Sequence, residues 1–160
     1  METWNRYGSG KIDLPITEYL IKAIESEIEK GSDLLVCIGT DSQRHGNKTK
    51  FTTVILLIAK GNGGNILYSN KYSKNYSSIK EKMIAEVAVS MEVAQEVCWV
   101  LDLYDVEFEL HADINSKPNT RSHVALSEAV GWVRGMGYTF KAKPDAYAAT
   151  HCADKICKRK

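Results

Sequence analysis

The sequence has no excess of charge of either sign. Its 160 residues include 21 Lys and Arg against 20 Asp and Glu, which gives a formal net charge of +1. That balance argues against a histone-like or polyanion-coating protein, whose affinity for nucleic acid comes mainly from the release of counterions. It does not exclude a nucleic-acid enzyme that contacts few phosphates. The hydrophobic fraction of 44% and the charged fraction of 26% are those of a soluble globular domain, so a disordered or collagen-like chain is excluded.

Long apolar runs are absent as well. The longest, Val54 to Ala59, is far too short to cross a bilayer, so we expect no membrane-spanning segment. The first residues, Met1 to Trp4, provide neither the basic region nor the apolar region of a secretory signal. We therefore predict a cytoplasmic protein with no membrane partner.

Two motifs that would indicate other chemistry are also missing. The four cysteines lack the paired CxxC spacing of a zinc site, which indicates reduced and mostly buried thiols. Cys152 and Cys157, with His151 beside them, are the weak exception. No GxxxxGK[ST] loop is present, so the sequence does not support phosphoryl transfer from a nucleotide.

Hydrophobic periodicity predicts an alternation of strands and helices. Apolar runs without polar alternation are typical of strands that are covered on both faces, whereas apolar residues at every third or fourth position indicate helices. The expected elements, in order, are a helix from Pro15 to Gly31, strands Leu34–Ile38, Phe51–Ala59 and Ile66–Tyr72, a helix Ser78–Asp102, a strand Val106–Asp113, a helix Ser122–Met136, a strand Tyr138–Lys141 and a helix Asp145–Lys158.

This order predicts an α/β fold with a five-stranded mixed sheet flanked by helices. The strand–helix–strand units require parallel strands joined by right-handed crossovers, and the first three strands form an antiparallel meander. We expect a single domain over residues 1–160, with residues 1–31 as an N-terminal helical extension and residues 32–160 as the core. The N-terminal helix could cover a sheet edge or pair with another copy of the chain in a homo-oligomer.

Two acidic residues stand at strand ends. Asp41 follows the apolar first strand, and Asp113 closes the fourth. If these strands are parallel neighbours they lie about 4.8 Å apart, and both carboxylates emerge at the edge where open α/β sheets bind ligands. A divalent cation such as Mg²⁺ or Mn²⁺ would relieve their repulsion. The alternative is that each acid only caps the turn that follows it.

Two further acids lie on predicted helices. Glu86 falls at the edge of the apolar half of its helix, near Ser90, whereas the other glutamates of that helix lie on the solvated side. Asp145 lies in the first turn of the last helix, on the same side as its buried stripe. A serine-paired Glu86 and an Asp145 that merely stabilises the helix N-terminus are the competing interpretations. Asp154 points nearly the opposite way from Asp145 and is the fallback.

The arrangement of these four acids on the predicted elements resembles that of ribonuclease H-like proteins. More narrowly, four segments between about Ser32 and Lys155 resemble the YkuK family, which is described as ribonuclease H-like. These segments are Ile38–Gln43, His111–Asn115, Gly131–Gly137 and Lys143–Ala149.

The resemblance implies a nuclease with two divalent metal ions, Mg²⁺ or Mn²⁺. Asp41 would bridge both ions, with Glu86 and Asp113 on one ion and Asp145 on the other. Such a pair of ions can activate a water molecule and stabilise the leaving oxygen of a phosphodiester. The predicted partner is therefore RNA, DNA or an RNA/DNA hybrid. The alternative function is a non-catalytic nucleic-acid-binding or assembly module that keeps the fold.

Other residues near these acids are weaker candidates. His111 faces the same way as Asp113 and could shuttle protons or orient a carboxylate, although a satisfied sheet histidine is the competing interpretation. Lys117, Asn119 and Arg121 follow Asp113 and are well placed to meet a substrate phosphate.

Overall fold

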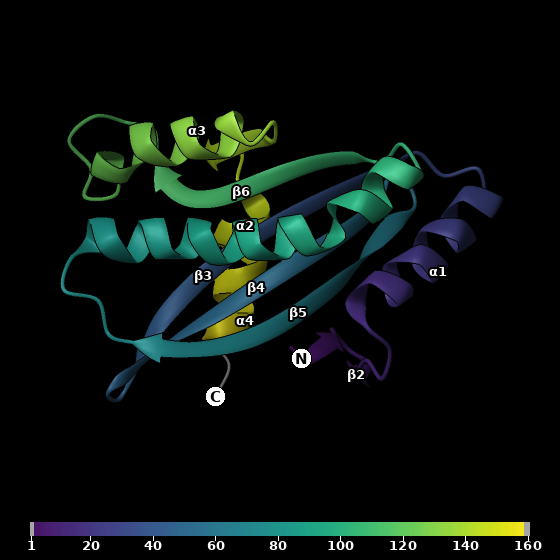
Figure 1. Cartoon of the computed structure of the whole chain (residues 1–160), viewed down its shortest axis with the longest axis horizontal. Helices are drawn as coiled ribbons and strands as arrows, with labels where there is room; N and C mark the ends of the chain where they lie inside the picture. The colour runs from purple at the N-terminus through teal and green to yellow at the C-terminus, as the bar shows by residue number, and fades with distance from the viewer. Residues whose placement is uncertain (1, 159–160) are drawn as a thin grey trace.

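The computed structural model describes residues 2–158 and is built on a single mixed sheet (Figure 1). Seven strands pair in the order β2-β1-β5-β4-β3-β6-β7. The predicted kind of fold is confirmed, with seven strands rather than five. The strands are β1 (Trp4–Arg6), β2 (Gly10–Lys11), β3 (Leu34–His45), β4 (Lys48–Ala59), β5 (Gly63–Lys74), β6 (Glu107–Asn115) and β7 (Thr139–Lys143).

The helices cover both faces of this sheet. In Figure 1, α2 lies in front of the strands, α1 lies at the right-hand side, and the yellow C-terminal helical segment crosses behind the strands. We use "C-terminal helical segment" for η2 and α4 together. The helical elements are α1 (Ile16–Glu29), α2 (Ile79–Leu103), η1 (His123–Ala125), α3 (Leu126–Gly135), η2 (Ala148–Ala153) and α4 (Asp154–Cys157). None of the helices within residues 2–158 is long and apolar enough to cross a membrane.

The two additional strands come from the N-terminal region. β1 pairs antiparallel with β5, and β2 pairs antiparallel with β1, so the N-terminal hairpin extends the sheet at its β5 edge. The expected extension over residues 1–31 is thus part strand and part helix. Buried side chains of α1, namely Ile16, Leu20 and Ile24, join the main hydrophobic core. The helix therefore packs against the same core as the rest of the chain.

The strands of the meander are longer than their apolar runs. β3 continues to His45 and β4 begins at Lys48, so the residues expected to form a polar loop instead form the end of a long hairpin. Antiparallel pairing runs without interruption from Leu34↔Ala59 to His45↔Lys48. The prediction that Asp41 follows the first strand was therefore wrong: Asp41 lies within β3, opposite Thr52. Backbone pairing with β4 extends the strand although its side chains become polar.

The parallel part of the sheet ends earlier. β3 and β6 pair in parallel only from Leu35↔Glu107 to Thr40↔Ala112. Beyond Thr40, β3 keeps its partner β4 but no longer pairs with β6. Asp41 and Asp113 are the first residues beyond the last parallel pair, so they mark the carboxyl edge of the parallel strands.

Candidate functional site

Asp41 and Asp113 are neighbours at the carboxyl edge of the parallel strands. Each follows a member of the last parallel pair, Thr40↔Ala112, so the two acids stand side by side on strands about 4.8 Å apart. Thr40 accepts a hydrogen bond from Ser90 of α2. Because side chains alternate along a strand, Asp41 points to the other face, towards the C-terminal helical segment. The predicted juxtaposition of the two strand acids is thus present.

Glu86 approaches the same edge from α2, on the opposite face of the sheet. Its carboxylate is 3% exposed and accepts a hydrogen bond of 2.7 Å from the hydroxyl of Ser42 on β3. Glu86, Ser90, Val93 and Val97 are all buried and follow the helical repeat of three and four residues. Glu86 therefore lies within the buried face of α2, deeper than the edge position expected from the sequence.

Burial makes both of these acids hard to ionise. Removal from water raises the pKa of Asp41 to about 6, the ammonium of Lys82 opposes this shift, and the carboxylates of Asp154 and Asp113 add to it. Removal from water raises the pKa of Glu86 to about 8, with Lys82 opposing and the charge of Asp41 adding to the shift. Asp41, Glu86, Asp113 and Asp154 thus form one electrostatic group, which we call the acid cluster.

The fourth member of the acid cluster is Asp154 rather than Asp145. Asp145 is exposed in a bend before the C-terminal helical segment, and its charge acts on His111. Asp154 is half-buried, and its charge acts on Asp41. A regular α-helix was expected here, but Ala148–Ala153 forms a π-helical turn. A π-helical turn contains more residues than an α-helical turn, so the residues after it point in other directions than a regular α-helix predicts.

The side chains around this π-helical turn differ correspondingly from the expected buried stripe. Ile156 is buried and Cys152 is half-buried, as expected, but Ala153 and Cys157 are buried too. The side chain of Ala149, the third expected member, lies outside the described residues. Asp154 is itself half-buried, and its charge acts on Asp41 of β3, so it lies near the sheet.

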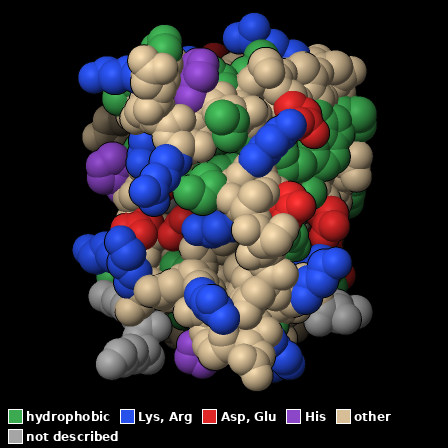
Figure 2. All heavy atoms as spheres, turned by 90° about the vertical axis from the view of Figure 1, so that its left-hand side faces the viewer, with side chains coloured by type: hydrophobic (Ala, Val, Ile, Leu, Met, Phe, Trp, Pro, Cys, Tyr) green, Lys and Arg blue, Asp and Glu red, His purple; other side chains and the backbone are tan. Residues whose placement is uncertain are grey.

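Three lysines compensate the acid cluster. Lys82 Nζ lies 3.5 Å from Glu86 Oε1, and the Lys143 ammonium forms an ion pair with Asp113. Lys158 Nζ lies 2.7 Å from Asp154 Oδ1. Figure 2 looks onto this end of the molecule and shows acidic side chains with Lys and Arg side chains on either side. The face is therefore mixed in charge rather than purely acidic.

The donor set of the acid cluster fits a hard divalent cation. All four members offer carboxylate oxygens, the ligands that Mg²⁺ and Mn²⁺ prefer. Asp113 Oδ1 is buried, and its partner within the described residues is the Lys143 ammonium, a cation whose place a metal ion would take. The carboxylate oxygens of the acid cluster are not closely grouped. Within residues 2–158, no three of its members have ligand atoms that all lie within 4.8 Å of one another.

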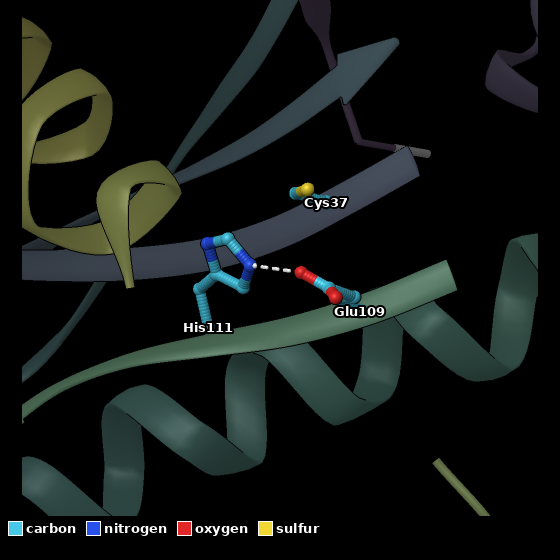
Figure 3. Close-up of side chains that lie close together, drawn as sticks. All are labelled: Cys37, Glu109 and His111. Carbon is cyan, nitrogen blue, oxygen red and sulfur yellow. Dashed lines mark hydrogen bonds and ion pairs between the residues drawn. The ribbon is translucent and has the colours of Figure 1, made fainter. Parts of the chain in front are cut away.

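Cys37, Glu109 and His111 do form such a compact group (Figure 3). His111 is fully buried, and its Nε2 lies 3.0 Å from Glu109 Oε2. The backbone N–H of Ala148 donates a hydrogen bond of 3.1 Å to its Nδ1. Since Nδ1 accepts, the proton of the neutral ring is on Nε2 and is donated to Glu109. Burial lowers the pKa of His111 below its usual value, which favours this neutral form.

This compact group is a hydrogen-bonded network rather than a metal site. A metal ion on Nε2 would displace its proton and move it to Nδ1, where it would face the N–H of Ala148. Burial also raises the pKa of the Cys37 thiol to about 11, although metal binding requires a thiolate. The Cys37 sulfur instead lies 3.3 Å from the hydroxyl of Tyr147. Cys37 and Glu109 were not among the candidates from the sequence. Glu109 precedes His111 by two residues on β6, and alternation along a strand puts the two side chains on the same face.

The three predicted phosphate contacts lie in the exposed segment between β6 and η1. Lys117 lines a cleft of about 490 Å³ together with Lys143 and His151. Asn119 and Arg121 are exposed and do not line that cleft. Of the predicted substrate residues, only Lys117 thus lies in a concave surface beside the acid cluster.

Comparison with known protein families gives the class of this protein. The sequence model of the family described as Ribonuclease H-like matches residues 16–158, so this chain belongs to the ribonuclease H-like proteins. Within that class it is a member of the YkuK family. It is 31% identical over 141 residues to "Uncharacterized protein YkuK" of Bacillus subtilis (strain 168), a match that covers 79% of this chain and 81% of that protein.

A solved structure is also similar in part. RNase H1 from the halophilic archaeon Halobacterium salinarum NRC-1 matches with a TM-score of 0.41 and 14% sequence identity. The match covers 71% of this chain and 89% of that chain.

Proposed function

We propose that the protein is a metal-dependent nuclease that hydrolyses phosphodiester bonds of RNA, DNA or an RNA/DNA hybrid. The observation that carries the proposal is the acid cluster at the carboxyl edge of β3 and β6. Two of its carboxyl groups have pKa values raised to about 6 and about 8, because the fold buries them next to other carboxylates. Ionised carboxylates that are buried beside one another destabilise a fold. A bound cation would relieve their repulsion and stabilise this arrangement.

The four members of the acid cluster would hold Mg²⁺ or Mn²⁺. Glu86 and Asp113 approach Asp41 from α2 and β6. Asp154 takes the position that the sequence analysis gave to Asp145, because its charge acts on Asp41. When bound, the ions would supply a nucleophilic hydroxide and stabilise the leaving oxygen. Ser42 keeps the Glu86 carboxylate oriented towards β3 through its hydrogen bond.

His111 contributes by positioning in this proposal. Its proton is donated to Glu109 and its other nitrogen accepts the Ala148 N–H, so neither nitrogen is free to exchange a proton with a substrate. The ring connects β6 to the start of the C-terminal helical segment, which carries Asp154. His111 therefore holds the helical segment rather than acting as the proton shuttle considered from the sequence.

The test compares Asp41→Asn with Asp145→Asn in cleavage of RNA, DNA and hybrid duplexes with Mg²⁺ or Mn²⁺. Asp41→Asn should lower cleavage by on the order of 100-fold or more, the size of the loss on removing one electrostatic contact to a transition state. Asp145→Asn should leave the cleavage rate within a factor of about 3 of wild type, because Asp145 lies outside the acid cluster. Such a factor corresponds to less than 1 kcal/mol of activation free energy. Equal cleavage by wild type and Asp41→Asn would disprove the proposal.

A non-catalytic binding module is the second candidate, and the lysines favour it. Lys82, Lys143 and Lys158 each pair with one member of the acid cluster, so the charges are largely balanced without a metal. The two candidates differ in a Mn²⁺ titration. A nuclease should bind Mn²⁺ with loss of affinity in Asp41→Asn, whereas a charge-balanced module should bind nucleic acid equally well with Mn²⁺ or EDTA.

A further inference from the structure

The cleft beside the acid cluster is built from three separate segments of the chain. Asn115, Ser116 and Lys117 come from the end of β6 and the segment after it. Lys143 and Pro144 come from the end of β7, and Thr150 and His151 come from η2. Its volume of about 490 Å³ lies in the range of small-molecule sites.

The lining of the cleft combines cationic and neutral polar side chains with the apolar Pro144. Lys117, Lys143 and His151 line the cleft, and no Asp or Glu of the described residues does. Lys117 forms no ion pair with any residue of the described range 2–158, in contrast to the three lysines of the acid cluster. Its ammonium is therefore free to bind an anion.

The polar groups of the lining are held in place by bonds within the cleft. The Ser116 hydroxyl donates to the Lys143 carbonyl, and the Lys117 N–H donates to the Asn115 side chain. Thr150 Oγ1 lies 2.8 Å from His151 Nδ1. The first of these contacts joins the segment after β6 to the end of β7, and the other two order groups within their own segments.

Lys143 connects the cleft with the acid cluster. It lines the cleft and at the same time forms the ion pair with Asp113. An anion in the cleft therefore lies within one lysine side chain of Asp113, one of the carboxylates that we propose to hold the cations. Two lysines around a concave surface attract phosphate oxygens.

We propose that this cleft binds a phosphate group of the nucleic acid, next to the phosphodiester that is cleaved. This inference rests on the proposed function, since it identifies the acid cluster as the place of cleavage. Lys117 and Lys143 bind the phosphate oxygens, and His151 borders them. A terminal phosphate and an internal phosphodiester share this chemistry and are separated by the experiment.

The experiment measures phosphate binding in EDTA by ¹⁵N NMR, so that no metal contributes. The probes are inorganic phosphate, a dinucleotide with a 5′-phosphate and the same dinucleotide without it. We expect shifts of the Lys117, Lys143 and His151 amides, and about tenfold weaker binding in Lys117→Gln, as for loss of one hydrogen bond to a charged group. Lys22→Gln, an exposed change on α1, is the matched control and should bind like wild type.

Each result then has a meaning. Tighter binding of the 5′-phosphorylated dinucleotide identifies a site for a terminal phosphate, and equal binding of both dinucleotides identifies a site for an internal phosphodiester. Equal binding by Lys117→Gln and Lys22→Gln, or shifts elsewhere only, overturns the inference. Asp41→Asn distinguishes this failure from that of the proposed function, because it should lose Mn²⁺ binding and keep phosphate binding.

Discussion

The hydroxyl of Ser42 on β3 donates a hydrogen bond of 2.7 Å to Glu86 on α2, inside the protein. This contact crosses from the sheet to the helix and opposes the effect of burial, because it lowers the pKa of Glu86. It also determines which way the carboxylate faces. Ser42 is therefore part of the acid cluster although it carries no charge.

Removing the Ser42 hydroxyl should affect both stability and ionisation. In Ser42→Ala, Glu86 keeps its burial and loses its neutral donor, so its pKa should rise further and the free energy of unfolding should fall by about 1–3 kcal/mol at pH 8. Ser90→Ala, which removes another buried hydroxyl of the same region, is the control. It should destabilise the protein without changing the pKa of Glu86, measured by ¹³C NMR of the carboxyl carbon. A Glu86 pKa that is the same in Ser42→Ala and wild type contradicts this prediction.

Without metal, the protein should become less stable as the pH rises. Asp41 and Glu86 have folded-state pKa values of about 6 and about 8, both above their ordinary values. Between its ordinary pKa and its folded-state pKa, each group binds more protons in the native state than in the unfolded state. The stability that depends on these two groups is therefore greatest below about pH 4 and is lost as the pH rises through about 6 for Asp41 and about 8 for Glu86. The slope is at most about 1.4 kcal/mol per pH unit for each carboxylate.

Urea unfolding in EDTA between pH 5 and pH 9 measures this loss. Glu86→Gln should remove the part of the slope above about pH 6 and retain the part that Asp41 contributes. A saturating concentration of Mn²⁺ should flatten the curve, since a cation favours the ionised form of both groups. Stability that is constant over this range in EDTA would show that neither carboxylate is protonated in the native state.

The acid cluster should lower the free energy of unfolding of the protein when no metal ion is bound. Asp41→Asn removes a buried charge and its repulsion by Asp113 and Asp154, so we expect the variant to be more stable than wild type by about 1–3 kcal/mol in EDTA at pH 8. In Mn²⁺ the order should reverse, because a ligand that binds only the native state stabilises wild type. Thermal unfolding under both conditions measures the two differences. A variant that is less stable in EDTA would indicate that Asp41 has a structural role.

Different parts of the site were accessible to sequence analysis for different reasons. Asp41 and Asp113 could be placed together because parallel strands bring their carboxyl ends to one edge. Glu86 could be identified because a charged residue on an apolar helix face has to be explained. Asp154 could not be preferred over Asp145, since the choice depends on the π-helical turn of η2, and a constant rotation of 100° per residue does not represent such a turn.

The remaining differences in the fold have similar causes. β1 consists of only three residues and β2 of two, too short for any alternation to be detected. The ends of β3 and β4 are polar, and only their mutual backbone pairing keeps them extended. The role of His111 depends on the N–H of Ala148, 37 residues further along the chain. Contacts of this kind arise from tertiary structure and leave no local pattern.

His111 should tolerate replacement by a residue that keeps an acceptor near Nδ1. In His111→Asn, the side-chain carbonyl can accept the Ala148 N–H. His111→Phe leaves that N–H without its acceptor and leaves Glu109 only its ion pair with Lys141. We expect His111→Phe to lose about 1–3 kcal/mol of stability, with faster hydrogen exchange at Ala148 and weaker Mn²⁺ binding through displacement of Asp154. His111→Asn should recover most of all three properties. If His111→Asn recovered stability but not Mn²⁺ binding, His111 would stabilise the fold without positioning Asp154, and the positioning role would be refuted.

The same histidine allows a direct test of whether the group of Cys37, Glu109 and His111 takes a metal ion. Co²⁺ bound to a cysteine thiolate absorbs strongly in the near ultraviolet, and that band should be absent when Co²⁺ is added at neutral pH, since burial raises the pKa of Cys37 to about 11. Cys37→Ser should therefore have the same Co²⁺ spectrum as wild type, while Asp41→Asn should lose the weaker visible bands of carboxylate-bound Co²⁺. A thiolate band that disappears in Cys37→Ser would mean that this group does bind the metal ion, with the Nε2 proton of His111 displaced to Nδ1. The hydrogen bond from Ala148 to Nδ1 would then have to break, and hydrogen exchange at Ala148 would speed up on addition of Co²⁺.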